Sequence, residues 1–198
     1  MFKISFCILL TLLAAQLATA IPLPHKEEGR HHAHDRPCFM TGTSEIPKDV
    51  VTDMKVICLP GRQPFKGVPD VQIANTVYSV QDFQREPSLS PVGFALKYFT
   101  PKTRSDEVTL ALENLMDVYG ATNAGLRSWG QEKHLEVKKI KGPSFYLAFQ
   151  HAISVGDMKA ATHQLGKVLK NCFNCTPQDK QQVVDIAVAN HVELPGCI

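Results

Sequence analysis

The residues best suited to chemistry in this 198-residue chain are Cys172 and Cys175, which stand in a C-x-x-C arrangement. Such a pair serves thiol–disulfide exchange when it opens a helix, because the positive end of the helix dipole stabilises a thiolate. Here the apolar spacing predicts that Cys172 ends one helix and that only Cys175 approaches the next. A zinc site would need two more ligands, for which Cys197 and His191 are the nearest candidates. We therefore favour structural disulfides over redox or metal chemistry.

The cysteines that remain once residues 1–20 are set aside are Cys38, Cys58, Cys172, Cys175 and Cys197. They predict two bridges and one odd thiol, and spacing alone does not choose among the pairings. We prefer Cys38–Cys58 together with a bridge from Cys197 to Cys172 or Cys175, because the C-terminal residues are long enough to fold back along a preceding helix. The alternative joins Cys58 to the C-terminal cysteines.

Histidines form the second group of candidates. His31, His32 and His34 could bind copper, nickel or zinc, but a solvated His-rich tail is the simpler interpretation because ordering a flexible site costs entropy. The remaining histidines are scattered, so that a catalytic pair could form among them only in three dimensions: His134, His151, His163 and His191. The sequence holds no G-x-S-x-G, H-E-x-x-H, phosphate-binding glycine loop or EF-hand loop. We predict no catalytic residue, metal ligand or cofactor.

Trp129, the single tryptophan, stands near Arg127. Both residue types are enriched at binding hot spots, so this pair could form a surface recognition spot. A lone tryptophan is more often part of a core, and the sequence leaves the two interpretations open.

The first twenty residues indicate the compartment. Lys3 precedes an apolar run that ends near Leu17, and Ala18 and Ala20 occupy the small-x-small positions of a cleavage site. This pattern predicts a secretory signal peptide and a mature chain from about Ile21. Such a chain reaches a compartment where disulfides form.

Charge and length narrow the classes of function. The formal net charge is only +2, which argues against a nucleic-acid binder, since such a protein needs a basic face. No second run of about eighteen or more apolar residues occurs, so we predict no membrane anchor. A chain of this length fits one domain with its own core.

Helical signals in the N-terminal half are interrupted by proline and glycine. Apolar residues at helical spacing predict one helix over about 46–57 and a short second helix that begins at Asp70. The apolar cluster 94–99 is compatible with helix or strand. The strongest signal lies over about 105–119, where Ser105 is the expected N-cap.

The helix over 105–119 has a defined apolar face. Leu112 and Leu115 lie at its centre, so we expect both to be deeply buried. Glu113 and Asp117 lie off that face and should meet water. Gly120 follows at the position where a left-handed residue ends many helices.

The C-terminal half is mostly helical. After a polar connection over 121–131 and a short strand-like segment over 134–140, residues 145–153 predict a central buried helix, with a strand over 145–149 as the rival. Another helix runs from Asp157 to Lys170. Thr176 and Pro177 then begin the last helix, which Asn190 ends.

These elements predict a mostly α fold: a single compact domain over 38–198, with about five to seven helices and at most a minor β element, cross-linked by about two disulfides. A signal peptide (1–20) and a disordered His-rich tail (21–37) precede it.

The function expected from these features is that of a secreted interaction protein without catalysis, such as an effector or an extracellular binding factor. Its partner would be an extracellular protein or a small apolar ligand. Two alternatives remain open. One is a small secreted enzyme whose site draws on scattered His and carboxylate residues, with His134, His151 and His163 as first candidates. The other is a carrier with an apolar cavity, lined by Phe145, Tyr146 and Phe149.

The cleavage site and the cysteines generate a first testable prediction. The intact mass of the secreted protein should correspond to a chain that begins near Ile21 and has lost the hydrogens of two disulfides. Native purification without reductant, followed by mass spectrometry, measures both properties. A chain that still begins at Met1, or one in which every cysteine is a free thiol, would refute the prediction.

Overall fold

The computed structural model of the protein describes residues 36–52, 54–59, 67–78, 86–130 and 135–196. Within these residues it contains five helices and a small sheet, so the mostly α fold with a minor β element is confirmed. The strands are β1 (Ile57–Cys58), β2 (Val71–Ile73) and β3 (Thr76–Tyr78). The helices are α1 (Pro91–Phe99), α2 (Asp106–Ser128), α3 (Leu135–Ser154), α4 (Met158–Lys170) and α5 (Pro177–Ala189). None of the described helices is long and apolar enough to cross a membrane.

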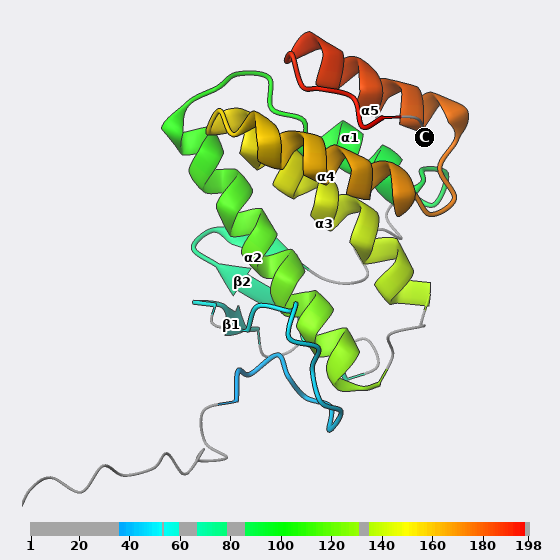
Figure 1. The fold of residues 1–198 in the computed structure, drawn as a ribbon. Helices are drawn as coiled ribbons and strands as arrows, with labels where there is room; N and C mark the ends of the chain where they lie inside the picture. Colours follow the sequence, from blue (N-terminus) through cyan, green and yellow to red (C-terminus); the bar gives the residue numbers. More distant parts are fainter. Residues whose placement is uncertain (1–35, 53, 60–66, 79–85, 131–134, 197–198) are drawn as a thin grey trace, which may run out of the picture. The chain divides into compact units, whose positions relative to one another are not determined.

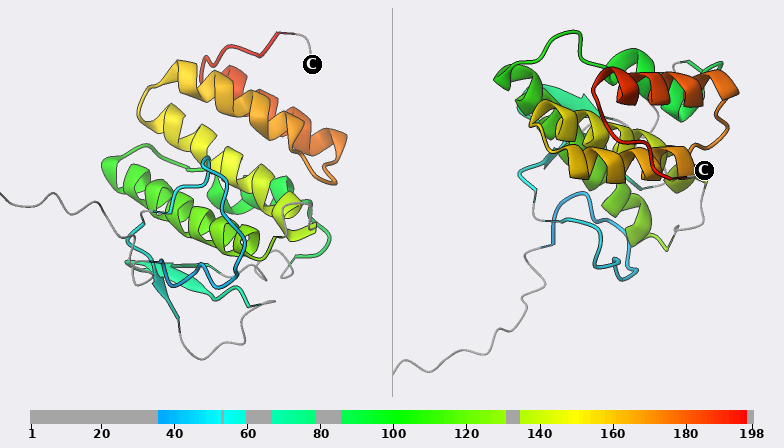
Figure 2. Two further views of the ribbon diagram at one scale, coloured as in Figure 1. Left: turned by 60° about the horizontal axis from the view of Figure 1, so that its bottom comes forward. Right: turned by 45° about the horizontal axis from the view of Figure 1, so that its top comes forward.

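Helix α3 lies at the centre of the arrangement (Figure 1), because it packs against α1, α2 and α4. The left view of Figure 2 shows the sheet, α2, α3 and α4 following one another from bottom to top. Helix α5 packs mainly along α1 and α4. Signal peptide 1–20 and nearly all of tail 21–37 lie outside the described residues, and both stay predictions.

Buried side chains form two clusters on either side of this central helix. One cluster joins the sheet, α2 and the first half of α3, and Tyr119 and Ile140 are fully buried in it. The other joins α1, the rest of α3, α4 and α5 around Tyr146 and Leu165. Phe99 packs against both clusters, with its ring edge-on to that of Tyr119 at 5.6 Å between centroids. The aromatic end of α1 therefore connects the two halves of the core.

The predicted helix over 46–57 is wrong. The described residues there are irregular, and Ile57 and Cys58 form β1, which pairs antiparallel with Gln72 and Val71. Valine and isoleucine favour extended backbone when a partner strand is present. The partner is distant in the sequence, so the local helical spacing was misleading.

The predicted short helix that begins at Asp70 is also wrong. Strands β2 and β3 form a hairpin in which Val71 pairs with Tyr78 and Ile73 with Thr76. Ala74, in the turn, has a left-handed φ of 47°. Alternating β-branched residues make a strand here, since one face of the hairpin packs on α2.

Helix α2 begins as predicted, with the Ser105 side chain accepting a hydrogen bond from the Val108 amide. It does not end at Gly120 but continues to Ser128, so the expected polar connection over 121–131 is wrong for most of its length. A side chain at Gly120 would lie 2.6 Å from the Met54 Cε atom. This glycine serves close packing and is not a helix stop.

Helix α3 replaces the strand-like segment expected over 134–140 and excludes the rival strand over 145–149. Val137 and Ile140 are fully buried, at the three-residue spacing of a helix. Charged and apolar residues alternate in this short stretch, and this alternation wrongly indicated the two-residue period of a strand. Asp157 and Thr176 cap α4 and α5 as predicted.

Two disulfides cross-link the described residues. Cys38–Cys58 is the pair preferred from the sequence, whereas Cys172 is joined to Cys175, so the preferred bridge from Cys197 to either of them is wrong. Cys197 itself lies outside the described residues. By loop length, the first bridge constrains the unfolded chain by about 3 kcal/mol and the second by only about 2 kcal/mol.

The face of α2 differs in detail from its prediction. Leu112 is only 3% exposed, but Leu115 is half-buried. Glu113 faces water as expected, whereas Asp117 is half-buried. Apart from Leu112, the buried residues of α2 lie between Val118 and Ser128, because the helix continues for nine residues beyond Tyr119 and its second half is the part in the core.

This register generates a second prediction. Leu112→Ala should lower the free energy of unfolding by about 2–5 kcal/mol, the range for a core leucine. Leu115→Ala should cost clearly less, because a half-buried side chain leaves a smaller cavity. Denaturant unfolding with the disulfides intact measures both, and Glu113→Ala is the exposed control. If Glu113→Ala were as costly as Leu112→Ala, the face assigned to α2 would be wrong.

Candidate functional site

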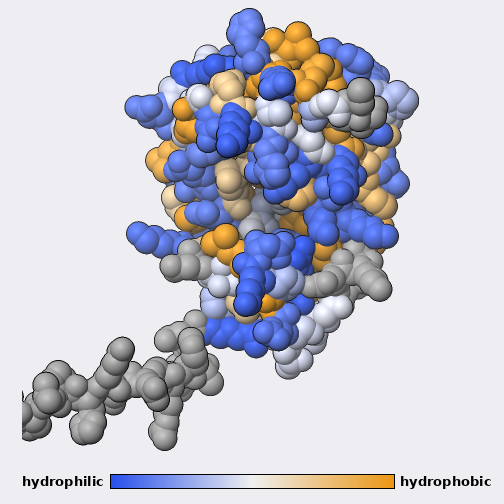
Figure 3. Space-filling model, in the orientation of Figure 1, coloured by the Kyte–Doolittle hydropathy of each residue, from blue (hydrophilic) through white to orange (hydrophobic). Residues whose placement is uncertain are grey.

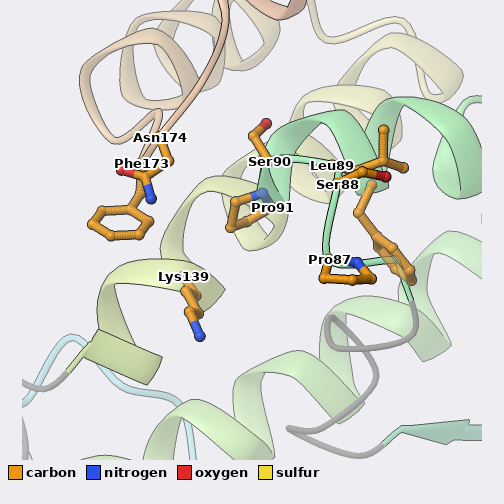
Figure 4. Close-up of a pocket in the computed structure, with 9 residues that line it drawn as sticks. Pro87, Ser88, Leu89, Ser90, Pro91, Lys139, Phe173 and Asn174 are labelled. Atoms are coloured by element: carbon orange, nitrogen blue, oxygen red, sulfur yellow. The ribbon is translucent and has the colours of Figure 1, made fainter.

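A pocket of about 330 Å³ opens where α1 begins, beside the connection between α4 and α5 (Figure 4). Figure 4 shows Phe173 and Asn174 on one side and the chain before α1 on the other, with Lys139 of α3 below them. The residues that line the pocket are Pro87, Ser88, Leu89, Ser90, Pro91, Phe94, Lys139, Phe173 and Asn174. The lining is about equally apolar and polar, with one cationic side chain.

The C-x-x-C motif forms one wall of this pocket. Phe173 and Asn174, its two middle residues, contribute to the lining, and Cys172 is bonded to Cys175 across them. Asn174 has a left-handed φ of 52°, which asparagine tolerates better than most residues. Both cysteines are half-buried. The disulfide is therefore neither sealed in the core nor fully exposed.

Two helices begin at the same place, next to this disulfide. Ser90 is the N-cap of α1 and accepts a hydrogen bond from the Gly93 amide at 2.8 Å. Thr176 is the N-cap of α5, and its amide donates to Asp179 Oδ2 at 2.8 Å. The Ser90 hydroxyl donates to the same Asp179 oxygen at 2.9 Å. We call this hydrogen bond the Ser90–Asp179 contact.

The electrostatics of the Ser90–Asp179 contact are favourable. A carboxylate at a helix N-terminus is stabilised by the positive end of the dipole, and Asp179 lies beside two such termini. Gly93 makes the approach possible, because a side chain at that position would lie 2.9 Å from Asp179 Oδ1. The Ser90 hydroxyl also lies 3.7 Å from the Cys175 sulfur. One hydroxyl therefore contacts α5 and the disulfide together.

Two further hollows continue from the pocket along α1 and α5. One of about 540 Å³ lies between the two helices, and one of about 340 Å³ lies near the end of α5. Leu89 lines the pocket and the first hollow, while Thr100 and Ile186 line both hollows. Each space thus shares a lining residue with the next, and we call the three spaces together the α1–α5 groove.

The α1–α5 groove combines apolar and polar side chains. Leu89, Leu96 and Ile186 supply apolar surface, and Lys97 and Asp185 are exposed beside them. On the face drawn in Figure 3, apolar side chains gather over the end of α5 at the top, among polar neighbours. This mixture is typical of protein-binding surfaces with an apolar centre and a polar rim.

The predicted histidine candidates do not gather in the described residues. His151 on α3 lies 3.1 Å from Glu113 on α2, measured from Nε2 to Oε1. His163 lies within α4 and His191 follows α5. The described residues hold no group of three or more potential metal ligands. His134 and the histidines of the tail lie outside the described residues.

The aromatic residues proposed to line a carrier cavity are packed. Tyr146 and Phe149 are fully buried, with their ring centroids 6.1 Å apart. Burial raises the pKa of Tyr146 to about 12, although hydrogen bonds to Thr100 and Gln150 act in the opposite direction. Phe145 is half-buried under the Lys167 ammonium. None of these three rings lines the pocket or the two hollows.

Trp129 lies at the surface and is 46% exposed. Its indole Nε1 donates to the Thr41 hydroxyl at 3.0 Å, and its ring covers Gly67. Arg127 is nearly buried beside Asp49, so the two side chains do not form one exposed recognition spot.

Sequence reasoning did not identify Ser90, Asp179 or the groove. A serine before a proline and the T-P-x-D pattern are local signals for two helix starts. Nothing in these signals shows that the two starts meet.

The neighbouring carboxylates Asp117 and Glu113 on α2 generate a third prediction, which concerns pH dependence. Burial, followed by the nearby Glu113 charge, raises the pKa of Asp117 above its ordinary value of 3.8. The folded state therefore binds the Asp117 proton more tightly than the unfolded state does. The protein loses stability as pH rises from about 3.8 through the raised pKa of Asp117. Asp117→Asn should be more stable than the natural protein near neutral pH by about 0.2–0.5 kcal/mol, the size of a like-charge pair one turn apart.

The gain from Asp117→Asn should vanish well below pH 3.8, where the carboxyl is protonated in both states. Urea unfolding near neutral pH and well below pH 3.8 measures this gain in stability. Asp185→Asn is the matched control, because the Asp185 carboxylate accepts a hydrogen bond from Gln181 on the exposed face of α5. A loss of stability in Asp117→Asn at neutral pH would refute the assigned cause.

A protein family shares most of this sequence. Residues 40–191 match a family described as a domain of unknown function, DUF7143. The matched range includes every described helix and strand, the disulfide Cys172–Cys175 and the Ser90–Asp179 contact. Searches of curated proteins and of solved structures find no significant match. The chain therefore belongs to the DUF7143 family.

Proposed function

We propose that the protein is secreted and acts outside the cell as a binding protein, and that the α1–α5 groove holds a segment of a partner protein. The apolar run of residues 1–20 with its cleavage site supports secretion. The two disulfides are compatible with an oxidising compartment. The groove is the observation that carries the proposal of binding.

The dimensions of the groove suit an extended or helical segment better than a compact small molecule. Its spaces are lined by residues of both α1 and α5, and each space shares a lining residue with the next. Leu96 and Ile186 present apolar side chains from opposite helices. Peptide segments bind such surfaces by placing apolar anchors between two helices.

Two charged groups beside the groove, Lys97 and Asp179, are engaged in structural contacts, which supports binding over acid–base catalysis. Lys97 forms an ion pair with Glu86, with Nζ 2.7 Å from Oε2. Asp179 accepts hydrogen bonds from Ser90 and the Thr176 amide. A general base needs a lone pair directed at a substrate, and these carboxylate contacts already face the protein.

The fourth prediction tests the groove. Mature protein bearing Leu96→Glu should lose its extracellular partner, because burying an unpaired carboxylate at an apolar interface is unfavourable. Quantitative mass spectrometry of proteins captured from the extracellular fluid should show a loss of about tenfold or more, equal to about 1.4 kcal/mol. Ile186→Glu, from the opposite wall, should lose the same protein.

Leu110→Glu is the matched control, since Leu110 is 57% exposed on α2 and lines none of the three spaces. Thermal unfolding of each variant checks that the fold survives. Partners retained by the natural protein and by Leu110→Glu, but lost by both groove variants, would support the proposal. Partners that bind all of these proteins equally would refute it.

A further inference from the structure

The geometry points to a further activity at the end of the α1–α5 groove: we propose that the Cys172–Cys175 disulfide exchanges with thiols outside the cell. The two residues between the cysteines, Phe173 and Asn174, line the pocket at the start of α1, and the disulfide joins residues only three apart in the sequence. By loop length, this bridge constrains the unfolded chain less than Cys38–Cys58 does, so less stability is lost when it opens.

Access to the disulfide is the first requirement for exchange. Cys172 and Cys175 are both half-buried, and Phe173 and Asn174 between them face into the pocket. A thiol that enters the pocket therefore meets the motif directly. The space of about 330 Å³ admits a small thiol or a single cysteine side chain of a protein.

The two sulfurs have different surroundings, which sets the direction of attack. Cys175 immediately precedes Thr176, the N-cap of α5, and its sulfur lies 3.7 Å from the Ser90 hydroxyl at the start of α1. The two helix N-termini favour negative charge at this sulfur. The Asp179 carboxylate opposes it, but Asp179 Oδ2 accepts from Ser90 and from the Thr176 amide. Cys175 is thus the better leaving group and Cys172 the sulfur attacked.

The exchange takes place in two steps. A thiolate attacks Cys172 Sγ, the bond between Cys172 and Cys175 breaks, and its electron pair leaves on Cys175 as a thiolate. A second thiolate then attacks the sulfur of the first thiol in this mixed disulfide and releases Cys172. Two external thiols are oxidised to one disulfide, and the protein disulfide is reduced to two thiols. The two protons lost by the external thiols are taken up by Cys172 and Cys175.

The lining of the pocket suits a thiol with an apolar or anionic body. Phe173, Leu89 and Phe94 supply apolar surface, and Lys139 is the cation among the lining residues. Glu136 lies 3.3 Å from Lys139 and reduces that charge. A low-molecular-weight thiol and a protein cysteine share the reacting group, so the experiment uses one probe of each kind.

The experiment treats native mature protein with millimolar reduced glutathione, traps free thiols with an alkylating reagent at successive times, and quantifies each cysteine by peptide mass spectrometry. The Cys38–Cys58 disulfide is the internal control. Cys172–Cys175 should open at least about tenfold faster than Cys38–Cys58, and oxidised glutathione should restore it. Equal rates for the two bridges, or opening only in denaturant, would overturn the proposal.

A cysteine-containing peptide with apolar flanks is the second probe. Faster exchange with glutathione identifies small thiols as the natural reactant, and faster exchange with the peptide identifies protein thiols. A Cys197→Ser sample excludes internal attack by the remaining cysteine, and loss of the reaction in that sample would overturn direct exchange. These comparisons do not depend on any variant of the site.

Ser90→Ala tests the role assigned to the hydroxyl. Its exchange should be several-fold slower if the Ser90 hydroxyl turns from Asp179 Oδ2 to the Cys175 thiolate as the disulfide bond breaks, because the variant has no hydroxyl to donate. Ser105→Ala is the control, since Ser105 caps α2 in the same way but lies away from the disulfide. Equal rates in Ser90→Ala and the natural protein would show that Cys175 is not the leaving sulfur.

Discussion

The interaction on which the candidate site depends is the Ser90–Asp179 contact. The Ser90 hydroxyl caps α1, and the Asp179 carboxylate accepts from the amide of Thr176, the N-cap of α5. A hydrogen bond of 2.9 Å joins the hydroxyl to the carboxylate. Each group would be useful in its own helix without the other. Their meeting fixes the distance between the two helix starts, and so positions the disulfide, the pocket and the end of the α1–α5 groove.

This constraint matters because α5 has few other attachments. It packs mainly along α1 and α4, with Val183 and Ala187 as its buried residues. The central helix α3, by contrast, is held from three sides. Elements with small buried area open more readily than the rest of a fold. Because α5 forms one wall of the groove, that wall can adjust to a partner. The Ser90–Asp179 contact holds the start of α5 against the start of α1.

Local signals allowed part of this structure to be predicted. The caps Ser105, Asp157 and Thr176 are confirmed, because a cap acts within a few residues. The hairpin of β2 and β3 was missed because its pairing and its packing on α2 override a short helical pattern. The site was missed for a related reason: Ser90 and Asp179 are 89 residues apart, and no spacing rule reports a contact formed by packing.

The most direct test of the central claim is a double-mutant cycle on Ser90→Ala and Asp179→Ala, measured by denaturant unfolding of the oxidised protein. Each single variant also loses its own cap, and the cycle subtracts those losses. The contact predicts a coupling free energy of about 1.5–3 kcal/mol, the size of a hydrogen bond to a charged group. Additive effects, with a coupling near zero, would show that the two helix starts are held together by something else.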